Sequence, residues 1–288
     1  MRRRLQEAFG KECSVTIHHV TKNNSVVKTG LAVNRPDAGC SPVLYLEQYY
    51  CDYQKGIPED VIIRKILDQY HAEKTALIPG PDIFRDTEYL MEHVVCRIVG
   101  QAGNESLLRG IPFRSFLDLA VIYYLEVELE KTDQAACMLN NEMLSASGIT
   151  ASLLDQCAVR NTKKRYPCKF ISMYDMLCGL SVFPFLPEEP EEKNAMYVLT
   201  NSKYRYGAFW MSDPDELSKI AGMLGESYYI LPSSVHECIV VRGSASPDED
   251  VLCKMVSEIN ASCVSPEEVL ADAVYYYRIR PGELARIR

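Results

Sequence analysis

The chain has 288 residues, of which 47% are hydrophobic and 24% are charged, so it can bury one large core or two ordinary ones. Its 31 Lys and Arg residues are outnumbered by 39 Asp and Glu residues, which gives a formal net charge of -8. An acidic balance of this kind disfavours nonspecific binding to nucleic-acid phosphates or anionic lipid. The composition therefore excludes extended disorder and argues against a nucleic-acid partner.

The N-terminal residues and the cysteines indicate the compartment. The chain begins with a basic segment but lacks the apolar run that a signal peptide needs after it. No stretch approaches the roughly 20 apolar residues that cross a bilayer. The 11 cysteines are odd in number and include no CxxC pair, which favours reduced thiols over a disulfide scaffold. We expect a cytoplasmic protein with no membrane partner.

The first 73 residues predict a small sheet with a helix on it. Residues 14–20 and 26–33 have strand character and are separated by asparagines, which favours a hairpin, and residues 43–47 give a third strand. Residues 58–73 form the clearest helical pattern, with proline at the first position and two acidic residues in the first turn. The predicted unit is three antiparallel strands covered by a helix.

Residues 82–161 predict mainly helices. An apolar stripe at helical spacing runs from Tyr89 to Val99, and residues 116–129 form a denser apolar run. The segment 121–124 within that run is also compatible with a strand. The length of the run and its leucines favour a helix.

A composition break at residues 183–195, with three prolines and four glutamates, predicts a linker. The first elements expected after it are a hairpin of residues 197–200 and 207–211 and a helix over 214–224. Asp213 is expected to begin this helix and Gly225 to end it. A hairpin of residues 228–231 and 237–241, a helix over 248–260 and an edge strand over 275–277 are expected to follow. The predicted class is α+β: an N-terminal antiparallel sheet with a helical region, then a smaller C-terminal ββαββα-like domain. The predicted domains are 1–182 and 196–288.

Several segments together resemble a known family. They are MYVLTN (196–201), ILPSSVHE (230–237), SPEEVLADAVYYY (265–277), SPVLYLEQYY (41–50) and IPFRSFLDLAVIYY (111–124). With these segments the chain resembles an uncharacterised clostridial-type bacterial family, the Domain of Unknown Function 5688 family, over nearly its whole length. The resemblance implies no established activity.

The short segment PSSVHE contains the densest group of reactive side chains: Ser233, Ser234, His236 and Glu237. Nucleophilic catalysis uses a hydroxyl, an imidazole base and an orienting carboxylate in contact, so these residues are candidate catalytic residues of a hydrolase. Triads are normally assembled from separate segments, and no GxSxG elbow is present. The favoured interpretation is a turn in which the serines bond the backbone.

Metal and cofactor motifs are absent from the sequence. His18 and His19 are neighbours on a predicted strand, so their side chains diverge, and there is no HExxH, CxxC or DxDxDG pattern. No glycine-rich phosphate loop occurs either. We expect neither a metal nor a cofactor.

Two surface groups are candidate binding residues. The basic run Lys163, Lys164 and Arg165 is the best local anion site, although cations at a helix C-terminus are also explained by its exposed carbonyls. The terminal run Tyr275, Tyr276 and Tyr277 is the other, because tyrosine favours protein interfaces. Packing of these tyrosines within the same chain is the favoured interpretation.

These patterns lead to one functional hypothesis and one alternative. We expect a noncatalytic binding or interaction protein, with another protein as a candidate partner and with an undetermined small-molecule ligand. The alternative is a hydrolase that uses Ser233 or Ser234 with His236. The absence of a recognisable catalytic motif favours the first hypothesis over an enzyme.

Overall fold

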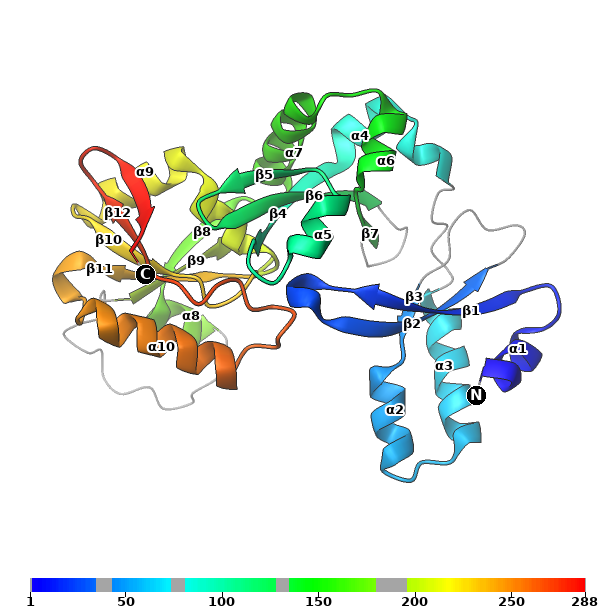
Figure 1. Cartoon of the computed structure of the whole chain (residues 1–288). Helices are drawn as coiled ribbons and strands as arrows, with labels where there is room; N and C mark the ends of the chain where they lie inside the picture. Colours follow the sequence, from blue (N-terminus) through cyan, green and yellow to red (C-terminus); the bar gives the residue numbers. More distant parts are fainter. Residues whose placement is uncertain (1, 35–42, 74–80, 128–134, 180–195, 288) are drawn as a thin grey trace.

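The computed structural model of the chain describes residues 2–34, 43–73, 81–127, 135–179 and 196–287 (Figure 1). Within these residues every strand pairing is antiparallel, and the strands form three sheets with helices packed around them. The predicted α+β class is confirmed. Among the helices that the structure describes, none combines the length and the apolar character needed to cross a bilayer.

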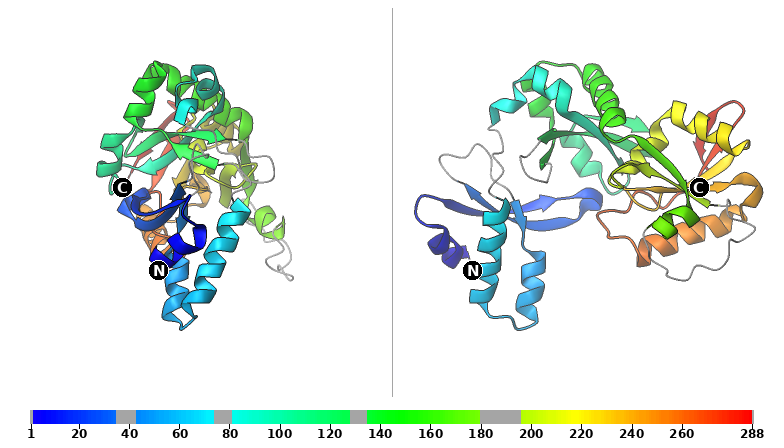
Figure 2. Two further views of the ribbon diagram at one scale, coloured as in Figure 1. Left: turned by 90° about the vertical axis from the view of Figure 1, so that its right-hand side faces the viewer. Right: turned by 180° about the vertical axis from the view of Figure 1, so that it is seen from behind.

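The N-terminal part of the chain builds the first sheet, in the strand order β1-β2-β3. Its elements are α1 (Arg2–Phe9), β1 (Ser14–Thr21), the 3-10 helix η1 (Asn23–Ser25), β2 (Val27–Asn34), β3 (Val43–Tyr45), α2 (Glu47–Gln54) and α3 (Glu59–Glu73). Helices α2 and α3 extend from the same side of the sheet (Figure 2). The predicted three-stranded sheet and its covering helix are confirmed.

This N-terminal module, residues 2–73, has a core of its own. Ile62 and Ile66 of α3 are fully buried in one cluster with Leu31 and Val33 of β2 and Leu5 of α1. Burying each isoleucine stabilises the module by roughly 1.5–3 kcal/mol. None of the buried residues in this cluster belongs to another buried cluster of the described chain. The module therefore buries its apolar surface as a unit.

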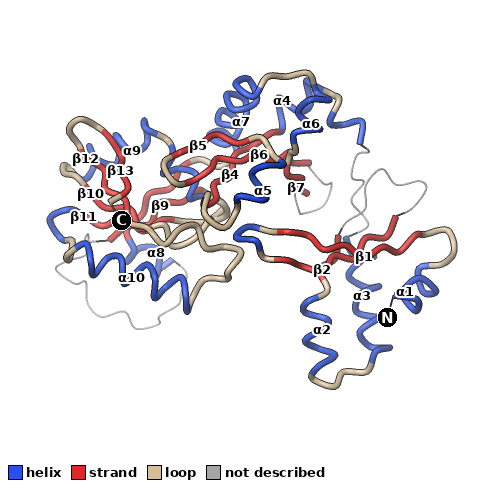
Figure 3. Tube along the Cα trace, viewed as in Figure 1, coloured by secondary structure: helices blue, strands red, loops and turns tan. Residues whose placement is uncertain are grey.

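The middle of the chain builds the second sheet, in which β6 pairs with β4 along one edge and with β5 and β7 along the other. The elements are η2 (Pro81–Phe84), α4 (Thr87–His93), β4 (Val94–Gly100), α5 (Glu105–Gly110), β5 (Phe113–Phe116), β6 (Leu119–Val127), β7 (Ala135–Met138), α6 (Asn141–Ser147) and α7 (Ala151–Arg165). Figure 3 shows these strands between α5 and the pair α4 and α7.

The prediction of helices in this region was wrong for the segments that form β4 and β6, whereas α4, α6 and α7 are helices. Strand β4 occupies the second half of the stripe from Tyr89 to Val99, and β6 occupies most of the run predicted as a helix over 116–129. All but one of the 9 residues of β6 are buried. A strand covered on both faces has a continuous apolar run, so its periodicity does not distinguish it from a buried helix. The β-branched and aromatic residues at 121–124 were the signal for a strand.

The C-terminal part builds the third sheet, in the order β13-β12-β10-β11-β9-β8. Its elements are β8 (Cys168–Ser172), α8 (Met173–Gly179), β9 (Met196–Asn201), the 3-10 helix η3 (Gly207–Ser212), α9 (Pro214–Leu224), β10 (Tyr228–Leu231), β11 (Cys238–Arg242), η4 (Gly243–Ala245), α10 (Glu249–Ser262), β12 (Tyr275–Arg278) and β13 (Glu283–Arg286). The predicted strand at residues 275–277 is confirmed, but it lies between β10 and β13 and not at the edge.

The start and end of α9 follow from its sequence. The Asp213 side chain accepts a hydrogen bond from the Glu216 N–H at 3.0 Å, and Gly225 ends the helix in the left-handed conformation at φ 73°. The prediction of a strand over 207–211 was wrong, because both edges of β9 are occupied by β8 and β11. That segment forms the buried 3-10 helix η3 instead.

The second and third sheets share one core. Val94 of β4 and Leu125 of β6 lie in the same buried cluster as Phe209 of η3 and Tyr228 of β10. Strand β8 belongs to the third sheet although it precedes the predicted linker. The linker at 183–195 lies outside the described residues, so the division of the chain at that point stays a prediction.

A polar junction joins the N-terminal module to the rest of the molecule at η1. The amide of Asn23 donates to the carbonyls of Glu267 and Val269 at 2.9 and 3.2 Å. Asn104, only 1% exposed, accepts from the Asn24 N–H at 2.9 Å. Its own amide donates to the side-chain oxygens of Asn23 and Asn24 at 2.8 and 3.2 Å. The module is thus held by interlocking asparagines.

Candidate functional site

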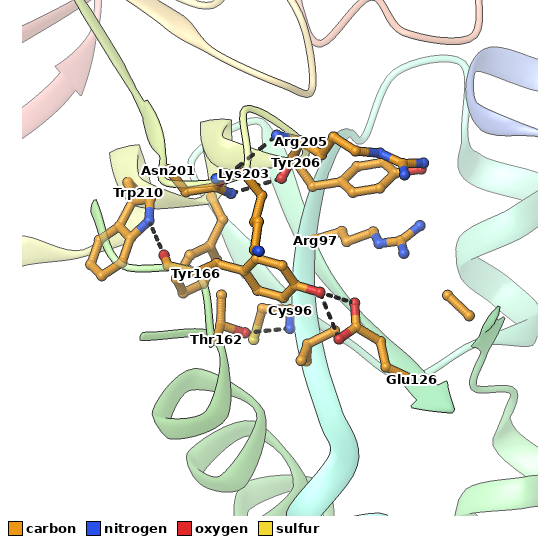
Figure 4. A pocket seen from close by; sticks show the side chains of 13 residues that line it. Cys96, Arg97, Glu126, Thr162, Tyr166, Asn201, Lys203, Arg205, Tyr206 and Trp210 are labelled. Atoms are coloured by element: carbon orange, nitrogen blue, oxygen red, sulfur yellow. Dashed lines mark hydrogen bonds between the residues drawn. The ribbon is translucent and has the colours of Figure 1, made fainter. Parts of the chain in front are cut away.

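A concave site lies where the second and third sheets meet. It is a cavity of about 300 Å³, and its wall is formed by β4, β6, the C-terminal end of α7, the loop after β9 and η3 (Figure 4). Three basic side chains, Arg97, Lys203 and Arg205, line it together with one acidic side chain, Glu126. Its volume is at the lower end of the range for small-molecule sites. We refer to it as the basic pocket.

The loop after β9 is held in a strained conformation that carries two of the cations. Tyr204 and Tyr206 have φ values of 54° and 57°, a region that side chains with a Cβ rarely adopt. Asn201, 2% exposed, offsets this strain, because its side-chain oxygen accepts from the N–H groups of Lys203 and Arg205 at 2.9 and 3.4 Å. Its amide donates to the Arg205 carbonyl at 2.7 Å. One buried side chain thus fixes the backbone of both basic residues at the pocket.

Arg97 of β4 lies between two aromatic rings. Its guanidinium carbon is 3.8 Å from the centre of the Tyr124 ring and 3.6 Å from the centre of the Tyr206 ring. Arg205 lies 5.9 Å from the same Tyr206 ring (Figure 4). Cation–π contacts of this kind stabilise a guanidinium by about 0.5–2 kcal/mol each. Because the two rings cover the faces of Arg97, its N–H edge is the part that can bind a ligand.

A buried carboxylate faces the same cavity. Glu126 of β6 is 3% exposed, and the Tyr166 hydroxyl donates to its two oxygens at 2.7 Å (Figure 4). Burial, and then the hydrogen bond to Glu126, raises the pKa of Tyr166, so the phenol keeps the proton that it donates. Arg165 lies 3.6 Å from Glu126, too far for a hydrogen bond, and offsets its charge in part.

The back of the pocket is fixed by hydrogen bonds from three elements. The Trp210 indole N–H donates to the Tyr166 carbonyl at 3.0 Å, and the Thr162 hydroxyl oxygen accepts from the Cys96 N–H at 2.8 Å. Burial raises the pKa of the Cys96 thiol. Cys96 is therefore a neutral, poorly nucleophilic side chain at neutral pH.

The described side chains that line the basic pocket are three cations and one carboxylate, together with uncharged residues. Among the described residues, Arg97, Lys203 and Arg205 form no ion pair with a carboxylate within 4.0 Å. Glu126 contacts Tyr166 and Arg165 rather than any of these three cations. Among the described residues that line the pocket, positive charges therefore outnumber negative ones by three to one, in a chain whose formal net charge is -8.

The serines of PSSVHE bond the backbone of their own turn. Ser234, 5% exposed, accepts from the N–H groups of His236 and Glu237 at 3.0 and 3.3 Å. Ser233 donates to the Glu237 carbonyl at 3.3 Å. Burial raises the pKa of the Glu237 carboxyl. These contacts are those of a structural turn between β10 and β11.

The His236 ring contacts groups other than the serines. Its Nδ1 accepts from the Tyr206 N–H at 3.1 Å, which assigns the proton of the neutral ring to Nε2. Nε2 lies 3.3 Å from the Glu268 carboxylate. The structure thus brings His236 to a carboxylate from a distant segment, but neither ring nitrogen faces Ser233 or Ser234. The histidine supports the loop that carries Arg205.

The basic run at the end of α7 is divided among three environments. Lys163 forms an ion pair with Asp213, and Lys164 is exposed. Arg165 lies beside Glu126 and also donates to the Glu92 carbonyl at 3.2 Å. Of the three predicted residues, only Arg165 lies next to the basic pocket.

The terminal tyrosines are part of the third sheet. Tyr275 is fully buried and donates to Asp118 at 2.7 Å, and Tyr277 is 3% exposed and stacks on Tyr228. Tyr276 is half-buried, with its ring centre 4.6 Å from that of Tyr229. Packing within the chain therefore accounts for these rings, and a partner could reach only part of Tyr276.

Sequence reasoning missed most of the basic pocket. Arg97, Glu126 and the Asn201 loop come from separate strands whose register brings them together, and no short motif marks them. The available signal was the alternation of basic and aromatic residues in Lys203–Tyr204–Arg205–Tyr206 directly after a strand. In the described part of the chain, no group of three or more His, Cys, Asp or Glu residues is arranged to hold a metal ion.

Comparison with known proteins gives a family and no activity. A model described as Family of unknown function (DUF5688) matches residues 1–279, which confirms the family resemblance predicted from the sequence. No curated protein matches the chain, and neither does any solved structure.

Proposed function

The chain belongs to the family of unknown function DUF5688, and from the geometry of its basic pocket we propose that it is a noncatalytic binding protein whose ligand is a small anion. The observation that carries the proposal is the convergence of Arg97, Lys203 and Arg205 on one cavity without a carboxylate partner among the described residues. We place the protein in a bacterial cytoplasm, and the free state of the described cysteines supports a reducing compartment.

The strained loop supports a binding role more strongly than exposed cations alone would. Strained φ values persist only where the surroundings determine them, and they cluster at functional sites. Here the hydrogen bonds of the buried Asn201 stabilise the strained loop. The loop in turn places Lys203 and Arg205 at the cavity that Arg97 also lines. The backbone that carries both cations is pre-organised, so binding does not require the loop to be ordered and more of the attraction is retained as affinity.

The side chains around the cavity support binding without catalysis. The Cys96 thiol is held neutral by burial, and the Tyr166 phenol is held protonated by burial and by Glu126. Neither is therefore an activated nucleophile or base at neutral pH. The alternative, a hydrolase that uses Ser233 or Ser234 with His236, stays a prediction that no contact of those residues favours.

Binding of inorganic phosphate and pyrophosphate, measured by isothermal titration calorimetry at low salt, tests the proposal. The double substitution Lys203→Ala and Arg205→Ala is expected to weaken binding by about 10-fold or more, because each lost charge-assisted hydrogen bond costs about 1.5–3 kcal/mol. The same titration at higher salt should show weaker binding to the wild-type protein.

A matched control removes two basic residues elsewhere. Arg64 on α3 and Lys254 on α10 are exposed, and the double substitution Arg64→Ala and Lys254→Ala changes the net charge by the same amount. This control should bind both anions as the wild type does. Equal binding by the two double variants, or no saturable binding to the wild type, would refute the anion-binding proposal.

A further inference from the structure

The most informative feature of the basic pocket is a separation of opposite charges. The carboxylate of Glu126 and the guanidinium of Arg97 line one cavity of about 300 Å³, yet they form no ion pair within 4.0 Å. Figure 4 shows the Glu126 carboxylate and the ends of Arg97 and Lys203 around the same space. Opposite charges in one cavity attract each other, so the contacts that fix each group decide whether they can pair.

Those contacts are visible on both sides. Arg97 is held between the rings of Tyr124 and Tyr206, at 3.8 and 3.6 Å. Glu126 is held by the Tyr166 hydroxyl at 2.7 Å. Each charged group is thus fixed by a contact with an aromatic residue, and both groups line the same cavity.

The Glu126 carboxylate also has unused capacity to accept hydrogen bonds. A carboxylate has about four acceptor positions. Among the described residues, the one hydrogen-bonding proton that reaches it comes from Tyr166, because Arg165 at 3.6 Å is beyond hydrogen-bond distance. A carboxylate that is 3% exposed and has a single donor is costly to bury unless a further donor or cation binds it.

We propose that the ligand is a small zwitterion, which places a protonated amine on Glu126 and an acidic group on Arg97, Lys203 and Arg205. This inference rests on the proposed function and specifies its ligand class. The compounds that fit are amino acids and amino-phosphates, which carry both charges on a few carbon atoms, and the cavity volume suits molecules of that size.

Matched pairs of compounds test the inference in the wild-type protein. We would compare L-glutamate with glutarate, and O-phosphoethanolamine with ethyl phosphate, by isothermal titration calorimetry at pH 7. At least one amine-bearing compound is expected to bind about 10-fold more tightly than its partner without the amine, as one added charge-assisted hydrogen bond provides.

Substitution of Glu126 by glutamine then tests whether Glu126 is the residue that binds the protonated amine. The amide oxygen of Gln still accepts from Tyr166, so the local hydrogen bond is retained while the negative charge is lost. E126Q is expected to bind the two members of each pair within about twofold of each other and to bind the compounds without an amine at least as tightly as the wild type does.

The outcomes separate the two proposals. Equal affinity of the wild type for both members of every pair overturns the zwitterion inference and leaves anion binding intact. A preference for the amine that persists in E126Q also overturns it. Binding of none of the four compounds and of neither phosphate probe overturns both. The wild-type comparison stands by itself if E126Q fails to fold in a thermal-melting control.

Discussion

Replacement of Gly207 with alanine is expected to lower the free energy of unfolding by about 1–3 kcal/mol, the usual cost of forcing a methyl group into a filled site. A Cβ at this position would lie 2.7 Å from both the Asn201 nitrogen and the His236 carbonyl oxygen, and closer still to the Thr200 hydroxyl. Two of these atoms belong to the backbone, so they cannot move aside as the end of a flexible side chain does.

The same substitution should disturb the basic pocket. The Gly207 N–H donates to the His236 carbonyl at 2.8 Å, and the neighbouring Tyr206 N–H donates to the His236 ring. A shift of this turn moves the Tyr206 ring away from Arg97. We therefore expect weaker phosphate binding together with the loss of stability, measured by calorimetry and by urea unfolding.

Gly222 provides the control for this prediction. It lies in α9, it is exposed, and an added Cβ would meet nothing within 4 Å. Gly222→Ala should stabilise the protein by roughly 0.5–1 kcal/mol, because alanine favours a helix over glycine. A Gly207→Ala protein as stable as the wild type would contradict the packing described around η3.

Substitution of Asn104 with alanine is expected to uncouple the unfolding of the N-terminal module from that of the rest of the chain. Asn104 joins the module to the rest of the chain through the N–H of Asn24 and the side-chain oxygens of Asn23 and Asn24. Asn23 and Asn24 are half-buried, so each hydrogen bond lost is expected to cost about 0.5–1.5 kcal/mol. Because the module has its own core around Ile62 and Ile66, it should then unfold at a lower temperature than the rest.

Differential scanning calorimetry measures this effect. The N104A protein should show two separate unfolding transitions. The wild type should show one transition, or two whose temperatures lie closer together. Asn141→Ala is the matched control, because Asn141 is exposed and its side chain makes one hydrogen bond, to the Arg109 carbonyl at 3.2 Å. A single transition in N104A at the wild-type temperature would show that the asparagine junction does not hold the module.

The elements that sequence predicted correctly are those whose signals are local. The helix from Pro214 to Leu224 has Asp213 before it and Gly225 after it, and both residues act as the predicted caps. The N-terminal hairpin follows from two alternating segments around Asn23 and Asn24. Such signals are sufficient because capping and turn formation depend on residues within one turn of the backbone.

The strands of the second sheet show where local signals fail. β4 and β6 are covered on both faces, so their apolar runs match a buried helix as well as a strand. Their identity depends on pairing between Val94–Gly100 and residues 119–125, which are separated along the chain. No window of a few residues contains that information.

The basic pocket was unpredictable for the same reason. Arg97, Glu126 and Asn201 belong to three strands of two sheets, and only the tertiary arrangement places them around one cavity. The PSSVHE segment was a candidate site because its reactive residues are adjacent in sequence. Its serines instead bond the backbone of their own turn, and the His236 ring accepts a hydrogen bond from the Tyr206 N–H. Adjacency in the sequence was a poorer guide to a site than convergence in space.

The side-chain NMR signals of the arginines provide the most direct test of the central claim, that the basic pocket holds an anion. The Nε–Hε signals of Arg97, Arg205 and the distant control Arg64 would be assigned by substitution and followed while inorganic phosphate is added at low salt. The account predicts that the signals of Arg97 and Arg205 shift together and saturate, while that of Arg64 stays in place. Shifts of Arg97 and Arg205 no larger than that of Arg64 would contradict it.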